Sequence, residues 1–279
     1  MKIINSIEEF RIFRRTLKGS VGFVPTMGAL HKGHISLVEK SNQCCDCTIV
    51  SIFINPQQFA EHEDLDVYPK HVERDIDLLS KFTVDAVFIP LSQIMYPKNY
   101  STYINETNMS LGLEGESRPT FFRGVATVVT KLFNIVQPSH SFFGEKDAQQ
   151  LRVISKIVED LNYPINIVPC PIVREENGLA MSSRNEYLSN EARQKASILF
   201  VALSNALLLL EKGERGVDTI KKNINETLLT EKNLTIDYIS VANYNTLENI
   251  DNEIEDDVLI SIAVFYQDIR LIDNVYFSI

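Results

Sequence analysis

Basic residues are in short supply in this sequence. It has 27 Lys and Arg against 37 Asp and Glu, a formal net charge of -10. A general nucleic-acid surface needs clustered Lys and Arg to meet the phosphates, so this composition argues against one. It does not argue against a small anionic substrate, because such a site needs only a few local cations and a helix N-terminus. We therefore expect small-molecule partners and no nucleic acid.

Cysteines and long apolar runs are also scarce. Three of the four cysteines stand in Cys44-Cys45-Asp46-Cys47, with no second pair at the spacing of a zinc site or a disulfide framework. We interpret them as small, mostly buried residues at the end of a helix. No run approaches the length of a membrane span, and charges recur within residues 1–10, unlike a signal peptide. These features predict a cytoplasmic protein with no membrane partner.

The patterns that are present are those of an α/β protein. Buried parallel strands are predicted at 21–24, 48–54, 84–90, 141–143 and 165–168. Amphipathic segments lie between them, and apolar residues recur at helical spacing over 125–136. The predicted fold class is a Rossmann-like, doubly wound parallel sheet domain over residues 1–173. After a polar, hinge-like stretch, three apolar or alternating runs predict a smaller C-terminal α+β domain over 174–279, with an antiparallel sheet.

Two further segments lack periodicity. Residues 60–68 are acidic and predict a loop, in which His62 is solvated. About thirty residues after Pro90 are rich in turn formers, and an irregular segment of that length in a compact domain is usually functional or lid-like.

A short motif, His31-Lys32-Gly33-His34, follows the strand at 21–24 and opens an amphipathic helix. Ligands bind at the carboxyl ends of strands in open α/β sheets, and a helix N-terminus suits phosphate. The two imidazoles can point the same way and donate hydrogen bonds to phosphate oxygens. Taken alone, such a motif is more often a turn that holds two ordinary histidines.

Other segments strengthen the phosphate interpretation. Gly144-Glu145-Lys146-Asp147 is a second strand–turn–helix unit, and Met181-Ser182-Ser183-Arg184 lies in the hinge-like stretch. A lysine, an arginine and two imidazoles on loops suit a polyphosphate. Asn55 and Gln58 end the strand at 48–54, so we place them on the same sheet edge as the histidines.

The chain resembles the pantothenate synthetase (pantoate beta-alanine ligase) family, in the nucleotidyltransferase superfamily that carries the His-x-Gly-His signature. The resemblance covers most of the chain and is densest before residue 190. It rests on the strings at residues 25–34, 53–59, 113–119, 143–150 and 181–185, with 270–274 similar to the family's closing strand. Several long strings in the right order are far more specific than one short motif.

The resemblance implies an ATP-dependent ligase of pantothenate and coenzyme A biosynthesis. ATP and (R)-pantoate would form pantoyl adenylate and pyrophosphate, and beta-alanine would then give pantothenate and AMP. Family members are homodimers through the larger domain, and magnesium accompanies ATP.

The resemblance also implies roles for individual residues. The catalytic residues would be His31, His34, Lys146 and Arg184. ATP would contact these and Met27, Gly28, Ala29, Leu30, Lys32, Gly33, Gly144, Glu145, Asp147, Val173, Met181, Ser182 and Ser183. Pantoate would contact Met27, Asn55, Gln58 and Gln150, and beta-alanine would contact Gln58. Taken singly, Met27 reads as a core methionine, and Gln58 and Gln150 as a loop amide and a solvated helix amide.

The sequence departs from the family pattern at two places. Phe121 stands where the family commonly has histidine in Arg-Pro-Gly-His-Phe, and Arg74 stands where members often carry an acidic residue. Asp75 is then the candidate protein ligand for magnesium.

Two other functions are compatible with parts of the pattern. One is a nucleotidyltransferase that leaves the adenylyl group on its product, as phosphopantetheine adenylyltransferases do. The other is a nucleotide-binding regulatory protein that has lost activity, for which a broken set of site residues would be the sign. Lys146, His31 and His34 are all present.

Overall fold

The computed structural model describes residues 1–60, 63 and 65–279, so His62 lies outside the described residues. The chain divides into two compact units. Unit 1 comprises Met1–Glu145 and Gln149–Pro171, and unit 2 comprises Lys146–Ala148 and Ile172–Ile279. Each unit has hydrophobic core clusters of its own.

Unit 1 is built on a parallel sheet. Its strands are β1 (Lys2–Ile4), β2 (Val21–Thr26), β3 (Cys47–Ile52), β4 (Ala86–Phe88), β5 (His140–Gly144) and β6 (Asn166–Cys170). They lie in the order β1-β4-β3-β2-β5-β6, and each neighbouring pair is parallel. The chain builds outward from β2 in one direction through β3 and β4, and in the other through β5 and β6. Such a reversal is the place where open α/β sheets bind ligands.

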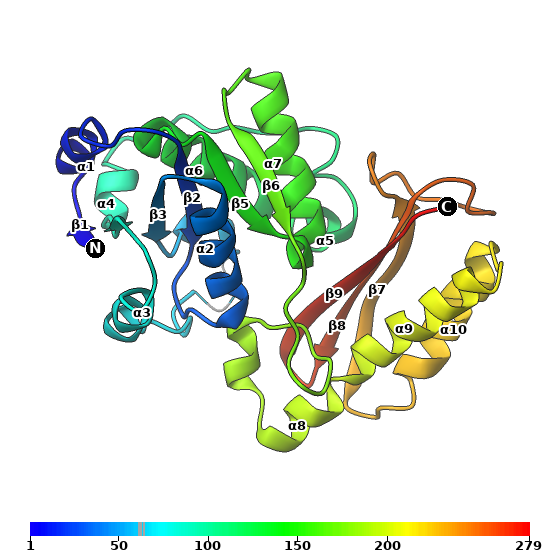
Figure 1. The fold of residues 1–279 in the computed structure, drawn as a ribbon. Helices are drawn as coiled ribbons and strands as arrows, with labels where there is room; N and C mark the ends of the chain where they lie inside the picture. Colours follow the sequence, from blue (N-terminus) through cyan, green and yellow to red (C-terminus); the bar gives the residue numbers. More distant parts are fainter. Residues whose placement is uncertain (61–62, 64) are drawn as a thin grey trace. The chain divides into compact units, whose positions relative to one another are not determined.

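Helices cover both faces of this sheet (Figure 1). One face packs against α1 (Ile7–Arg14), α6 (Phe121–Val136) and α7 (Ala148–Asp160). The other face packs against α2 (Lys32–Cys44) and α3 (Val72–Leu79). Phe23 and Val24 of β2 belong to opposite clusters, because successive side chains of a strand point to opposite faces. The predicted doubly wound α/β fold is confirmed.

Unit 2 combines helices with an antiparallel sheet. Its elements are η3 (Ser183–Tyr187), α8 (Asn190–Lys195), α9 (Ile198–Glu211), α10 (Val217–Leu228), β7 (Leu234–Asn243), β8 (Val258–Tyr266) and β9 (Ile269–Phe277). The strands lie in the order β7-β8-β9, and both pairs are antiparallel. Helices α9 and α10 pack their apolar residues against one face of this sheet. The small antiparallel sheet predicted from the sequence is confirmed.

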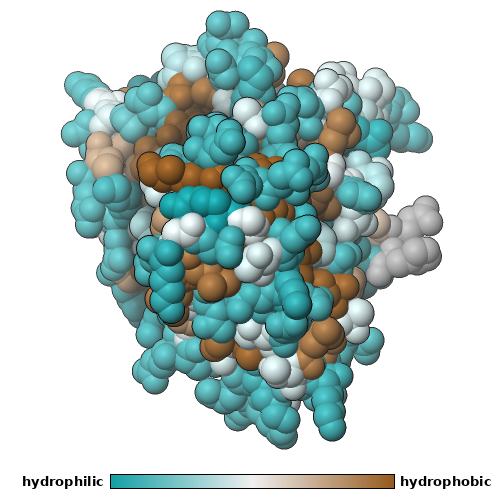
Figure 2. All heavy atoms as spheres, turned by 90° about the vertical axis from the view of Figure 1, so that its right-hand side faces the viewer, coloured by the Kyte–Doolittle hydropathy of each residue, from teal (hydrophilic) through white to brown (hydrophobic). Residues whose placement is uncertain are grey.

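One segment of unit 2 does not fit the prediction that no apolar run approaches membrane-spanning length. Among the described residues, the helical segment Asn190–Glu211 is long and apolar enough by length and composition. Leu199, Leu203 and Leu210 of this segment are buried in the core of unit 2, whereas Val201 and Leu208 are exposed. One such helix is by itself weak evidence of a span. On the face drawn in Figure 2, hydrophobic areas are separated by larger hydrophilic ones.

Two other sequence-based expectations also need correction. Cys44, the last residue of α2, is exposed, because this helix ends at the surface. Cys45 and Cys47 are only half-buried, and Cys47 already opens β3. The segment after Pro90 is not wholly irregular. It contains the short helices α4 (Ser92–Met95) and α5 (Leu113–Ser117).

Candidate active site

The turn between β2 and α2 carries the His-x-Gly-His motif and has an unusual backbone. Gly28 and Ala29 both adopt positive φ angles, of 85° and 50°. The side chain of Asp75, on α3, holds this turn: its Oδ2 accepts from the Ala29 N–H at 2.9 Å and its Oδ1 from the Leu30 N–H at 2.8 Å. A Cβ on Gly28 would lie 3.1 Å from Asp75 Oδ2, so the glycine permits the close approach.

Both carboxylate oxygens of Asp75 therefore accept hydrogen bonds from the backbone of the motif turn. Asp75 is 1% exposed, and burial raises the pKa of its carboxyl while the two N–H groups act in the opposite direction. The described residues contain no group of three or more His, Cys, Asp or Glu that could hold a metal ion. This geometry assigns the Asp75 carboxylate to the turn rather than to a cation, so it does not fit the predicted role of magnesium ligand.

Both histidines take part in starting α2. His31 is the N-cap, and its Nδ1 accepts from the Gly33 N–H at 3.1 Å. His34 Nδ1 accepts from the His31 N–H at 3.3 Å, which completes a reciprocal capping box. An acceptor Nδ1 places the proton of a neutral imidazole on Nε2. The centroids of the two rings lie 4.1 Å apart, so one helix N-terminus carries two neighbouring Nε2–H donors.

A second group of predicted residues surrounds η1 (Pro56–Gln58), after β3. Asn55 Nδ2 donates to Gln58 Oε1 at 3.0 Å and to the Gly124 carbonyl at 3.1 Å. Asn55 Oδ1 accepts from the Gln57 N–H at 3.2 Å and from the Tyr96 hydroxyl at 2.8 Å. These partners fix the orientation of the Asn55 amide, because the Gly124 carbonyl can only accept and the Gln57 N–H can only donate.

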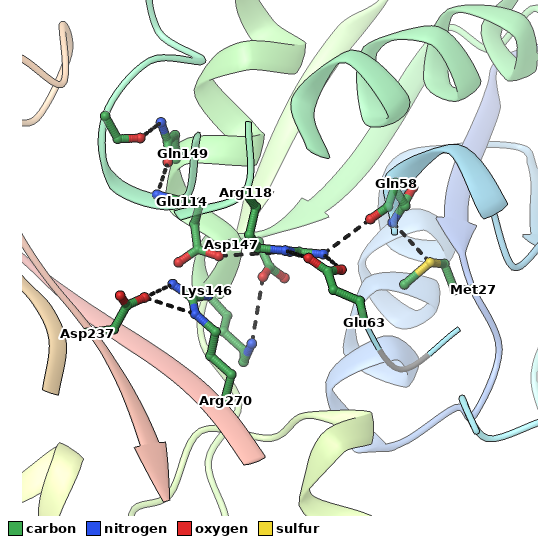
Figure 3. A network of polar contacts seen from close by, with 11 residues as sticks. Met27, Gln58, Glu63, Glu114, Arg118, Lys146, Asp147, Gln149, Asp237 and Arg270 are labelled. Carbon is green, nitrogen blue, oxygen red and sulfur yellow. Dashed lines mark hydrogen bonds and ion pairs between the residues drawn. The ribbon is translucent and has the colours of Figure 1, made fainter. Parts of the chain in front are cut away.

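The orientation of Gln58 follows from that of Asn55. With Oε1 engaged by Asn55, Gln58 directs Nε2 toward Met27 Sδ, 3.0 Å away (Figure 3). Gln58 thus combines N–H donors with an adjacent apolar thioether, a surface that suits a molecule with both oxygen acceptors and methyl groups. Sequence reasoning missed Tyr96 and Gly124. A Cβ on Gly124 would lie 2.1 Å from the Gln57 carbonyl oxygen, so α6 can approach η1 only with glycine there.

The adjacent glutamines of α7 differ in environment. Gln149 is buried and accepts from the Glu114 N–H at 3.0 Å (Figure 3). It also donates to the carbonyl of Met109 at 2.9 Å, and the two contacts tie the 109–114 segment to α7. Gln150, the residue predicted to bind pantoate, is half-buried at the same helix start.

Phe121, one of the two positions where the sequence departs from the expected pattern, packs against Arg118. Its guanidinium lies 3.8 Å from the centre of the Phe121 ring, and its Nε donates to Glu63 Oε1 at 2.6 Å. It also donates to the Gln58 carbonyl at 3.2 Å. The Phe121 ring thus stacks on an arginine that also contacts Gln58.

In unit 2, Lys146 occupies η2 (Glu145–Asp147), directly after Glu145 of unit 1. Its ammonium lies 3.7 Å from Asp147 Oδ1, and its carbonyl accepts from Asn274 Nδ2 at 2.8 Å. Gly144, the last residue of β5, reaches the same edge of the parallel sheet as Thr26 of β2, because β2 and β5 are parallel neighbours.

The remaining predicted residues of unit 2 lie on or directly after a tight β-ribbon formed by residues 173–181. An antiparallel bridge joins Arg174 to Ala180, and the Met181 N–H donates to the Val173 carbonyl at 3.0 Å. Ser182 then caps η3, since its hydroxyl accepts from the Arg184 N–H at 3.3 Å.

Two side-chain contacts hold this ribbon. Asp273 of β9 is 2% exposed and binds the Arg174 guanidinium through two contacts of 2.6 and 3.0 Å. Burial raises the pKa of Asp273, and the Arg174 guanidinium acts in the opposite direction. Asn185 donates to Glu175 at 2.8 Å and to the Ala180 carbonyl at 3.1 Å.

The predicted residues therefore form two groups, one in each unit. Unit 1 brings together the motif turn, with Met27 beside Gln58 and Asn55, and it also holds Gly144, Glu145 and Gln150. Unit 2 holds Lys146 and Asp147, and it brings Val173 and Met181 together on the ribbon, with Ser182, Ser183 and Arg184 directly after it at the start of η3.

This fold and this motif define a class. A doubly wound parallel sheet, with His-x-Gly-His between a central strand and the helix that follows it, is the arrangement of α/β enzymes that bind a ligand at the carboxyl edge of the sheet. The model of the family "Pantoate-beta-alanine ligase" matches residues 2–276. The chain belongs to the pantoate-beta-alanine ligase family.

Individual relatives are similar over their whole length. A pantothenate synthetase from Acetivibrio thermocellus is 51% identical over 278 residues, which cover 99% of each chain. The crystal structure of pantothenate synthetase from Thermus thermophilus is 40% identical, with a TM-score of 0.93 and 99% of each chain covered. A pantoate-beta-alanine ligase from Francisella tularensis, complexed with beta-gamma ATP and beta-alanine, is 33% identical. Its TM-score is 0.77, with 99% of this chain and 97% of that chain covered.

Proposed function

We propose that this protein forms pantothenate from (R)-pantoate and beta-alanine with ATP as co-substrate, through a pantoyl adenylate. The observation that carries the proposal is the match of the family model to residues 2–276. The Francisella tularensis relative, whose structure is a complex with beta-gamma ATP and beta-alanine, supports ATP and beta-alanine as substrates.

The proposed reaction has two steps. A pantoate carboxylate oxygen attacks the α-phosphorus of ATP, a P–O bond forms, and pyrophosphate leaves. The amine of beta-alanine then attacks the acyl carbon, a C–N bond forms, the amine loses a proton, and AMP leaves with the electrons of the broken C–O bond.

The first step needs fixed hydrogen-bond donors more than a general base, because negative charge builds up on the phosphates. We propose that the Nε2–H groups of His31 and His34 and the N-terminus of α2 supply donors. Lys146 and Arg184 supply the cations that ATP needs. We propose that ATP also contacts Met27, Gly28, Ala29, Leu30, Lys32, Gly33, Gly144, Glu145, Asp147, Val173, Met181, Ser182 and Ser183.

Pantoate carries a carboxylate, two hydroxyls and two geminal methyl groups. We propose that Gln58 and Gln150 bind its oxygen atoms without adding charge beside the triphosphate, and that Met27 packs on the methyl groups. The sequence predicts that Asn55 contacts pantoate. Because protein groups engage its amide at both ends, we propose instead that Asn55 orients Gln58. Gln58 also contacts beta-alanine.

Magnesium would accompany ATP and offset the charge of its phosphates, and no described residue is assigned to hold it, because both oxygens of Asp75 accept from the motif turn. We further propose a cytoplasmic homodimer in which residues 1–173 bind nucleotide and pantoate, with residues 174–279 as a cap domain.

One assay tests the reaction. We expect isotope exchange between pyrophosphate and ATP only when pantoate is present, and AMP release only when beta-alanine is added. Exchange without pantoate, or none at all, would overturn the mechanism. A stable adenylylated product would instead identify an adenylyltransferase, and nucleotide binding without turnover would identify a regulatory protein.

A variant tests the role of Lys146. Lys146→Ala should abolish pantoate-dependent exchange and leave the circular dichroism spectrum unchanged, because the side chain is assigned to phosphate. An unfolded variant would show instead that the lysine is structural.

A further inference from the structure

Residues 270–274 have no role in the proposed reaction, yet they include two buried polar side chains of β9, those of Asp273 and Asn274. Asp273 and Asn274 are 2% and 6% exposed. As neighbours on a strand they point to opposite faces of the sheet. Each binds a different loop of unit 2. Asp273 binds Arg174 at the start of the ribbon, and Asn274 donates to the Lys146 carbonyl at 2.8 Å.

The contact with Lys146 is the more informative one. Lys146 lies in a three-residue 3-10 turn, which is too short to be held by a regular ladder of its own hydrogen bonds. A carbonyl can only accept, so the partner atom of Asn274 must be the amide nitrogen. Asn274 is in turn fixed by the sheet, where it pairs with Ser261 of β8, and by its N–H, which donates to Asp273 Oδ1 at 2.8 Å.

We propose that Asn274 is a positioning residue of the reaction: its side-chain amide holds the main chain of Lys146, so that the ammonium meets the triphosphate from a fixed point. The proposal rests on the function proposed above. A displacement of a reacting group by about 1 Å can cost about 100-fold in rate. A partly relaxed turn should cost less, and we expect about a 10-fold loss.

Two variants separate the hydrogen bond from the shape of the side chain. Asn274→Ala removes the whole amide. Asn274→Asp keeps the shape but sets a carboxylate oxygen against the Lys146 carbonyl, so it lacks the donor. Ser261→Ala is the matched control, because Ser261 is the cross-strand partner of Asn274 on the same face and is 7% exposed.

The measurement is steady-state kinetics together with pantoate-dependent pyrophosphate exchange. We expect both Asn274 variants to lose about 10-fold in exchange rate and in kcat, with kcat/KM for beta-alanine unchanged, since beta-alanine reacts after the phosphate step. Ser261→Ala should keep the wild-type rate.

Several results would overturn the inference. They are wild-type exchange in both Asn274 variants, an equal loss in Ser261→Ala, a loss of kcat/KM for beta-alanine that matches the loss of kcat, or an unfolded state of both Asn274 variants by circular dichroism. Failure of the proposed function is a different result, because the wild-type protein itself would then show no pantoate-dependent exchange.

Discussion

Removal of the Asp75 side chain should loosen the turn that presents the two histidines. Asp75→Ala leaves the N–H groups of Ala29 and Leu30 without their acceptors, in a turn with two positive φ angles. An unpaired buried N–H costs about 1–3 kcal/mol. Removing a buried carboxylate, whose pKa is raised by burial, recovers part of this cost. We expect a net loss of about 3 kcal/mol in the free energy of unfolding.

Thermal unfolding followed by circular dichroism measures this loss, which corresponds to a fall in Tm of roughly 6 to 12 °C. Asp77→Ala is the matched control on α3, because Asp77 is exposed and its ion pair with Lys81 lies on the surface. Asp75→Asn should fall between the control and Asp75→Ala, since it keeps one acceptor and no buried charge.

The same variants give a pH test with a definite sign. Because the pKa of Asp75 is raised in the folded state, the folded protein binds this proton more tightly than the unfolded chain. The contribution of Asp75 to stability therefore decreases as the pH rises from the unfolded to the folded pKa, and both Asp75 variants lose this dependence.

A magnesium titration tests the alternative role of Asp75. If the carboxylate anchors the turn, Asp75→Ala lowers kcat while the magnesium concentration for half-maximal activity stays at the wild-type value. An unchanged Tm with a shift of that concentration to higher values would refute the reasoning and restore Asp75 as a metal ligand.

Two further predictions concern a hydroxyl and the thiols. Tyr96→Phe keeps the ring but removes the donor to Asn55 Oδ1, so steady-state kinetics should show a KM for pantoate about 5-fold higher with the KM for ATP unchanged; an unchanged KM for pantoate would contradict the relay to Gln58. Burial raises the pKa of Cys170 to about 11, so alkylation at pH 8 followed by mass spectrometry should modify exposed Cys44 and reach Cys170 only in urea. Labelling of both thiols at equal rates in the native protein would contradict this burial.

Much of the fold could be predicted from the sequence because strands and helices have local periods. The run that contains β3 is almost continuously apolar, which is typical of a strand covered on both faces, and the spacing over 125–136 matches the buried face of α6. The motif turn was also predictable, since it lies where a strand gives way to a helix. The exposure of Cys44 was not, because residue type alone does not tell where a helix end meets the surface.

The contacts that shape the candidate site could not be predicted in the same way. Asp75 binds backbone groups about 45 residues away along the chain, and no residue type marks a backbone N–H as a partner. Tyr96 stands in a segment without periodicity, and its role depends on a single hydroxyl contact with Asn55. Asn274 lies in a strand, β9, and its partner is a carbonyl 128 residues earlier. Such long-range contacts of side chains with the backbone leave no periodic signal.

The reciprocal histidine cap at the start of α2 affects how mutants of the motif are to be understood. Replacing either imidazole by alanine removes a proposed phosphate donor and at the same time a capping interaction worth about 1 kcal/mol to the helix. Rates measured for such mutants thus combine lost chemistry with a frayed helix end. Asparagine in place of His31 separates the two, since its side-chain oxygen can still cap the helix while it carries no imidazole.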